Sequence, residues 1–155
     1  MLTKETKHKI DTLRDLLVGK IPNPQGQVQQ ITLALIYKFM SDIDDQTSGI
    51  FAGSSFFDGE FVQYKWTHLM DSKLSAQERL NLYAEWLEKI PLNPKVPTLF
   101  KSIFKQAFLP YRNPTTLTSF LKKIDEFEYE HSEDLGDAFE YLLSLIAWFW
   151  VLVFW

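Results

Sequence analysis

The sequence predicts an all-α protein, a single bundle-like domain of about six to seven helices. Three observations support this prediction. Apolar residues recur at helical spacing in several segments. Residue types that favour helix starts precede two of these segments, and no segment alternates apolar and polar residues over the length of a strand. We expect residues 1–147 to form the domain and 148–155, which contain no polar residue, to be an atypical apolar tail.

The first half of the chain predicts helices over residues 4–18, 27–45 and 60–71. The first helix would place four apolar side chains on one face: Ile10, Leu13, Leu17 and Val18. The second helix has a wider apolar stripe and follows a turn at residues 22–26, Pro-Asn-Pro-Gln-Gly. A Gly- and Ser-rich loop at residues 47–55 separates the second helix from the third.

The second half predicts three further helices, followed by a linker and a last helix. Ser75 and Glu78 form a capping box that opens a helix carrying Trp86. Three prolines then keep the chain extended before a short helix over residues 98–107. Asn113-Pro114 predicts the start of the next helix, whose apolar residues are Leu117, Phe120, Leu121, Ile124 and Phe127. An acidic linker at 128–134 leads to a last helix that begins near residue 134.

Composition narrows the classes of function. The chain has 155 residues, 46% of them hydrophobic and 23% charged, as expected of one soluble globular domain. The absence of cysteine excludes disulfides and thiolate chemistry. The net charge of −4 argues against a protein that holds nucleic acid through bulk positive charge alone. The apolar run at 145–155 is shorter than the about twenty residues that cross a bilayer, so we expect a cytoplasmic protein with no membrane partner.

No catalytic, cofactor-binding or metal-binding residues are predicted. The three histidines, His8, His68 and His131, are far apart and have no partner at ligand spacing. Asp42-Ile-Asp-Asp45 resembles the opening of a calcium loop, but the required glycine is replaced by Thr47. The sequence contains no phosphate-binding loop and no nucleophile elbow. A chain of this kind is not expected to be an enzyme by itself.

Basic residues are the remaining candidates for a binding role. Five of them cluster in the second half and are predicted to contact DNA phosphates: Lys101, Lys105, Arg112, Lys122 and Lys123. Four more, Lys4, Lys7, Lys9 and Arg14, lie on the first predicted helix. The alternative interpretation is a solvated helix face, in which these side chains are balanced by nearby glutamates.

Two segments carry a resemblance to a known family. Residues 13–21 and 29–42, the latter ending in Tyr-Lys-Phe-Met-Ser-Asp, are similar to the N-terminal helical domain of type I restriction-modification DNA methyltransferases, in the modification (M) subunit. Residues 135–143, Leu-Gly-Asp-Ala-Phe-Glu-Tyr-Leu-Leu, resemble the segment that leads into the catalytic domain of that family. The two matches bracket nearly the whole chain.

The resemblance implies an adenine-N6 DNA methyltransferase that uses S-adenosylmethionine. It also implies partners: DNA, a specificity subunit and a restriction subunit. The family's glycine-rich cofactor turn and its Asn-Pro-Pro-aromatic catalytic motif do not occur here, because none of Asn23-Pro24, Asn93-Pro94 and Asn113-Pro114 continues as Pro-aromatic. We therefore interpret the chain as the N-terminal domain without the catalytic half. It would handle DNA and dock the other subunits.

The apolar tail departs from the family pattern after about residue 147. Exposed bulky apolar residues drive association, so we expect a homodimer or larger species held by Phe149, Trp150, Leu152, Phe154 and Trp155. An alternative function stays open at this point. The chain would then be a free-standing helical protein-interaction module whose tail binds a hydrophobic partner or a membrane surface.

Overall fold

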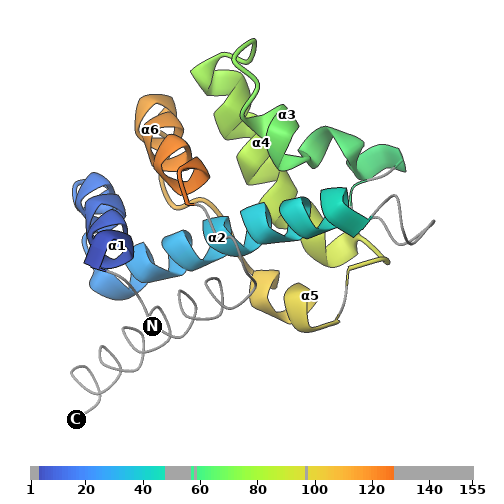
Figure 1. Ribbon diagram of the computed structural model, residues 1–155, viewed down its shortest axis with the longest axis horizontal. Helices are drawn as coiled ribbons and strands as arrows, with labels where there is room; N and C mark the ends of the chain where they lie inside the picture. The colour runs from blue at the N-terminus through green and yellow to red at the C-terminus, as the bar shows by residue number, and fades with distance from the viewer. Residues whose placement is uncertain (1–3, 48–56, 58, 97, 128–155) are drawn as a thin grey trace. The chain divides into compact units, whose positions relative to one another are not determined.

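The computed structural model describes residues 4–47, 57, 59–96 and 98–127 (Figure 1). Within these ranges the regular elements are six α-helices and two short 3-10 helices, with no strand, which confirms the all-α prediction. In chain order they are α1 (Lys4–Leu17), α2 (Pro24–Thr47), η1 (Gly59–Tyr64), α3 (Trp66–Leu69), α4 (Ala76–Lys89), η2 (Ile90–Leu92), α5 (Thr98–Phe104) and α6 (Pro114–Asp125).

The chain divides into two compact units. Unit 1 comprises residues 1–34 and 119–155, and unit 2 comprises residues 35–118. Helices α2 and α6 each supply residues to both units. Several predictions fall on residues outside the described ranges. They are the acidic linker, the last helix, the family-like segment 135–143, the boundary at residue 147 and the homodimer contacts Phe149, Trp150, Leu152, Phe154 and Trp155. Among the helices that are described, none is long and apolar enough to cross a membrane.

Unit 1 buries the apolar face predicted for α1, with one exception. Ile10, Leu13 and Leu17 are fully buried, whereas Val18 is 60% exposed. The prediction for Val18 is wrong because α1 ends at Leu17. The N–H groups of Lys20 and Ile21 both donate to the Leu17 carbonyl, at 2.9 and 2.7 Å, which turns the chain after the last helical residue. The rest of the described core of unit 1 consists of Ile21, Val28, Ile31, Leu33, Ala34, Phe120, Leu121, Ile124 and Phe127.

Two helices begin with the same Asn-Pro pair. At α6, the Asn113 side chain accepts from the N–H of Thr116 at 2.9 Å, which confirms the predicted cap. At α2, the Asn23 side chain accepts from the N–H of Gly26 in the same way. The segment 22–26 is therefore not a turn, as predicted, but contains the first residues of α2. Pro24 suits the first helical position because its missing N–H would have no partner there.

Unit 2 is built around the indole ring of Trp86 on α4. Trp86 is fully buried. Its ring centroid lies 5.0 Å from that of Phe57, 5.2 Å from Tyr64, 5.4 Å from Tyr37 and 6.3 Å from Phe61. Rings at these separations attract one another in addition to the area that they bury. One of the two hydrogen bonds of the predicted capping box is seen at the start of α4, where the N–H of Glu78 donates to the Ser75 hydroxyl at 3.1 Å.

The predicted helix over residues 60–71 is instead two short helices, η1 and α3. The backbone is extended at Lys65, with φ −54° and ψ 141°. Two side chains of α2 hold this break. The Tyr37 hydroxyl donates to the Tyr64 carbonyl, and the Ser41 hydroxyl accepts from the N–H of Trp66 at 2.9 Å. Ser41 thereby satisfies an N–H at the start of α3 that has no carbonyl partner within the helix.

The end of α3 and the turn after it are tied to α4 by a buried arginine. The Arg79 guanidinium donates to the carbonyls of Leu69 and Asp71 at 2.8 Å each, to that of Leu74 at 3.4 Å, and to the Thr118 hydroxyl at 3.3 Å. Arg79 is 6% exposed. Carbonyls at a helix C-terminus lack donors within the helix, and a planar guanidinium can satisfy several of them at once.

Replacement of Arg79 by methionine should destabilise the protein. The change keeps much of the apolar stem but removes every donor. The Leu69 carbonyl at the end of α3 then loses its partner, and the Asp71 and Leu74 carbonyls in the turn each lose a donor. We expect a loss of about 3 kcal/mol in the free energy of unfolding, measured by urea denaturation. Arg112→Met is the matched control, because Arg112 is exposed, and should change stability by less than about 0.5 kcal/mol. Equal effects of the two substitutions would contradict this role for Arg79.

A pair of Tyr→Phe substitutions tests the hydroxyl of Tyr37. Both Tyr37 and Tyr83 are fully buried. The Tyr37 hydroxyl donates to the Tyr64 carbonyl, whereas the Tyr83 hydroxyl has no hydrogen-bond partner among the described residues. Tyr37→Phe should therefore cost about 1–2 kcal/mol, and Tyr83→Phe should be neutral or slightly stabilising. The difference between their urea midpoints measures the bond, and a larger loss for Tyr83→Phe would refute the assignment.

Candidate nucleic-acid interface

The described residues offer no arrangement for metal chemistry. No group of His, Asp and Glu in the described ranges could hold a metal ion, and the sequence has no cysteine. His8 on α1 and His68 on α3 are both exposed.

The segment of α2 that carries the family resemblance has a structural role in unit 2. Tyr37 and Ser41 hold the break between η1 and α3, and the Lys38 ammonium lies 3.5 Å from the Asp42 carboxylate. Lys38 and Ser41 are themselves buried. The Tyr-Lys-x-x-Ser-Asp pattern is therefore explained by local packing and hydrogen bonding within unit 2.

The buried tyrosines are held in their neutral form. Burial raises the pKa of Tyr37, Tyr83 and Tyr111, and a neighbouring tyrosine adds to the effect at Tyr37 and Tyr83. Burial, followed by the hydrogen bond that its hydroxyl donates to Glu85 at 2.6 Å, raises the pKa of Tyr64. Phenols with raised pKa values stay protonated near neutral pH, so they serve as hydrogen-bond donors and apolar surface.

The five predicted DNA contacts fall in both units. Lys101, Lys105 and Arg112 belong to unit 2, and Lys122 and Lys123 belong to unit 1. Lys101 is half-buried and the other four are exposed. Lys101 lies in the last turn of α5, and both lysines of unit 1 lie in the last turn of α6. A positive charge at a helix C-terminus is stabilised by the helix dipole, which gives these three lysines a structural role as well.

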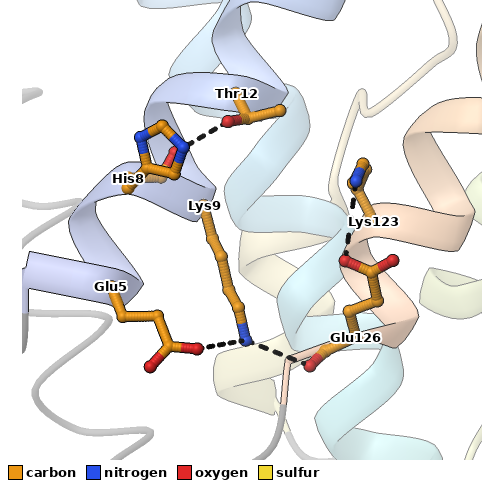
Figure 2. A network of polar contacts seen from close by, with 6 residues as sticks. All are labelled: Glu5, His8, Lys9, Thr12, Lys123 and Glu126. Carbon is orange, nitrogen blue, oxygen red and sulfur yellow. Dashed lines mark hydrogen bonds and ion pairs between the residues drawn. The ribbon is translucent and has the colours of Figure 1, made fainter.

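In unit 1, one lysine of α1 is engaged with the end of α6 (Figure 2). The Lys9 ammonium lies 3.4 Å from the Glu126 carbonyl, 3.9 Å from the Glu5 carboxylate and 5.8 Å from the centre of the Phe127 ring. Lys123 pairs with the Glu126 carboxylate at 3.7 Å. Both partners of this second pair are about half exposed, and such ion pairs are weak, so Lys123 can exchange its partner for a phosphate.

The prediction from sequence did not use one signal around the candidate residues, the absence of acidic residues. From Lys89 to Ile124 the chain contains no aspartate or glutamate. All five predicted DNA contacts lie in this stretch, together with Lys89 and Lys95. A protein with a net charge of −4 therefore has a continuous stretch in which every charge is positive. In unit 2 this stretch also contains exposed apolar side chains, at Leu92, Ile103 and Phe108.

Comparison with known proteins adds no assignment. No family model, no curated protein and no solved structure matches this chain.

The raised tyrosine pKa values predict a loss of stability at alkaline pH. A buried phenol whose pKa lies above that of the unfolded chain binds its proton more tightly in the folded state. Its contribution is fully present below about pH 10, the value for a free tyrosine, and is lost as the pH rises above it. Each such tyrosine should lower the free energy of unfolding by up to about 1.4 kcal/mol per pH unit.

Urea denaturation from about pH 8 to about pH 11 measures this slope. The Tyr83→Phe variant should show a shallower slope than the wild type, by about one proton. Phenolate absorbance that reaches its full value before the helical circular dichroism changes would show that the tyrosines titrate in the folded state and would contradict the prediction.

Proposed function

We propose that this chain is the N-terminal domain of the modification subunit of a type I restriction-modification system. In that role it handles DNA and docks the other subunits of an adenine-N6 methyltransferase. It is not catalytic by itself, because S-adenosylmethionine binding and methyl transfer belong to the part of the family that follows this domain. Its partners would be DNA, the specificity subunit and the restriction subunit.

The observation that carries the proposal is the structural role of the family-like segment. Tyr37 and Ser41 in this segment make hydrogen bonds that fix η1 against α3. Lys38 and Asp42 form an ion pair one helical turn apart. A pattern whose residue types are required by packing specifies a fold, so the same pattern in another chain predicts the same local fold. The residues that carry the resemblance are therefore residues that this chain uses to fold, and this supports the proposal that the chain is such a domain.

The DNA-handling role requires phosphate contacts that do not depend on sequence. Lys105 and Arg112 in unit 2 and Lys122 and Lys123 in unit 1 are exposed. Contacts of this type release counterions from the duplex, so the affinity falls as salt is added. A domain with an overall negative charge should bind duplex only weakly by itself, with a dissociation constant on the order of 10⁻⁴–10⁻⁶ M.

Fluorescence anisotropy with a labelled duplex tests this function. We expect binding at about 0.05 M salt that weakens steeply toward about 0.2 M. Two double variants with reversed charge locate the phosphate-binding residues. One combines Lys122→Glu with Lys123→Glu, and the other combines Lys105→Glu with Arg112→Glu. At least one pair should weaken binding about tenfold and reduce the salt slope by about 0.9 for each phosphate that the variant no longer neutralises.

Lys73→Glu is the matched control for these reversals. Lys73 is exposed in the turn before α4 and lies outside the stretch that lacks acidic residues. Its reversal should leave the salt slope unchanged. The DNA-handling role fails if the wild type shows no salt-dependent binding, or if Lys73→Glu weakens binding as much as both paired reversals.

A further inference from the structure

The stretch of unit 2 from Lys89 to Arg112, here called the basic–apolar segment, combines two kinds of exposed side chain. It contains no carboxylate. Its exposed basic residues are Lys95, Lys105 and Arg112. Lys89 and Lys101 are half-buried, and Lys89 pairs with Glu85 of α4 at 3.6 Å. It also holds three of the five large apolar side chains that are exposed in the described residues: Leu92 at 73%, Phe108 at 63% and Ile103 at 37%.

The backbone of the segment fixes the position of its exposed apolar residues. Asn93 is buried, and its side chain accepts from the N–H of Lys95 at 3.0 Å. The N–H of Val96 donates to the Asn93 carbonyl at 3.2 Å, and Val96 is buried. This turn is anchored by Asn93 and Val96, and it leaves Leu92 facing solvent at the end of η2. Helix α5, which carries Ile103, packs against η2.

In the second half of the segment, buried and exposed residues alternate along the chain. After α5 the chain turns at Gln106, which has a φ of 67°, a conformation that is uncommon outside glycine. The N–H of Ala107 donates to the Phe104 carbonyl at 3.0 Å. From there burial alternates with a period of two. Ala107, Leu109 and Tyr111 are buried, and Phe108, Pro110 and Arg112 are exposed. Phe108 and Arg112 therefore face the same side.

The mixture of charge and apolar surface decides between two kinds of partner. A DNA duplex presents a wall of phosphates that would engage the lysines and Arg112, but its backbone offers no apolar surface to cover Leu92, Ile103 and Phe108. An amphipathic protein helix with carboxylates beside an apolar stripe would satisfy both. Its apolar stripe would bury the three side chains, and its carboxylates would face the basic ones.

We propose that the basic–apolar segment is a docking surface for an acidic amphipathic helix of a protein partner. This rests on the subunit-docking half of the proposed function and assigns it to particular residues. Lys101, Lys105 and Arg112 then serve the protein partner. Phosphate contacts come from unit 1, where Lys122 and Lys123 are exposed without large apolar neighbours on α6, whose apolar residues in that unit are buried.

The test uses the full chain and a synthetic peptide of about five helical turns. The peptide carries leucines at helical spacing on one face, glutamates on both flanks and a fluorescent label, and anisotropy measures its binding. We expect the protein to bind it. Replacing the glutamates by lysines, or the leucines by serines, should weaken binding at least about tenfold, because the two interactions act together.

Protein variants locate the peptide on the segment. Leu92→Ser with Phe108→Ser, and separately Lys105→Glu with Arg112→Glu, should each weaken peptide binding about tenfold. Val18→Ser and Lys73→Glu are the matched controls, because both residues are exposed outside the segment, and should leave binding unchanged. Circular dichroism verifies folding, and the milder pair Leu92→Ala and Phe108→Ala replaces any serine variant that does not fold.

Three outcomes would overturn the proposal. The first is no binding of the peptide by the wild type. The second is peptide binding that the Leu92 and Phe108 variants leave unchanged. The third is a loss of duplex binding on reversing Lys105 and Arg112 as large as that on reversing Lys122 and Lys123, which would make the segment a phosphate-binding surface. Peptide binding needs no DNA, so a chain that binds peptide but not duplex would refute the DNA-handling role and leave this inference intact.

Discussion

The structure of unit 2 depends on the burial of Trp86. Its ring contacts those of Tyr37 on α2, of Phe57, and of Phe61 and Tyr64 on η1. Residues distant in sequence are thereby joined in one apolar core. The arrangement places the Tyr37 hydroxyl beside the Tyr64 carbonyl and the Ser41 hydroxyl beside the N–H of Trp66. Burial of the rings brings the polar groups together, and the hydrogen bonds then fix one geometry.

The fold class and most helices could be predicted because their signals are local. The spacing of Leu117, Phe120 and Ile124 and the Asn113-Pro114 start are both visible within one segment, and both are confirmed. The break at Lys65 could not be predicted in this way, because the hydroxyl that holds it belongs to Ser41 on α2. The start of α2 was predictable in principle, since Asn23-Pro24 repeats the pair at α6. The glycine two residues later made the segment resemble a turn.

Of the candidate site, only the charged residues could be predicted from the sequence. Charge placement predicted Lys105 and Arg112 as phosphate contacts, and both are exposed in the structure. Nothing in the local sequence predicts that Leu92 and Phe108 of the same segment are exposed, because a leucine between prolines and a phenylalanine after a helix are ordinarily buried. Their exposure follows from the Asn93 turn and from the alternation after Gln106. Both are properties of the folded backbone, and they change the kind of partner that the same lysines favour.

The two units thus offer different chemistry to a partner. In unit 1, the basic residues of α1 and α6 lie among carboxylates, and Lys9 and Lys123 already have acidic or carbonyl partners. Such exposed pairs exchange at little cost, which suits contacts that must form and break along a duplex. In unit 2, residues 89–112 contain no carboxylate of their own, although Lys89 pairs with Glu85 of α4 at 3.6 Å, and their exposed apolar side chains favour a partner that excludes water. Exchangeable contacts suit DNA, and a surface that excludes water suits a lasting protein interface. The division of charge and apolar surface between the units therefore separates DNA handling from subunit docking in the proposed function.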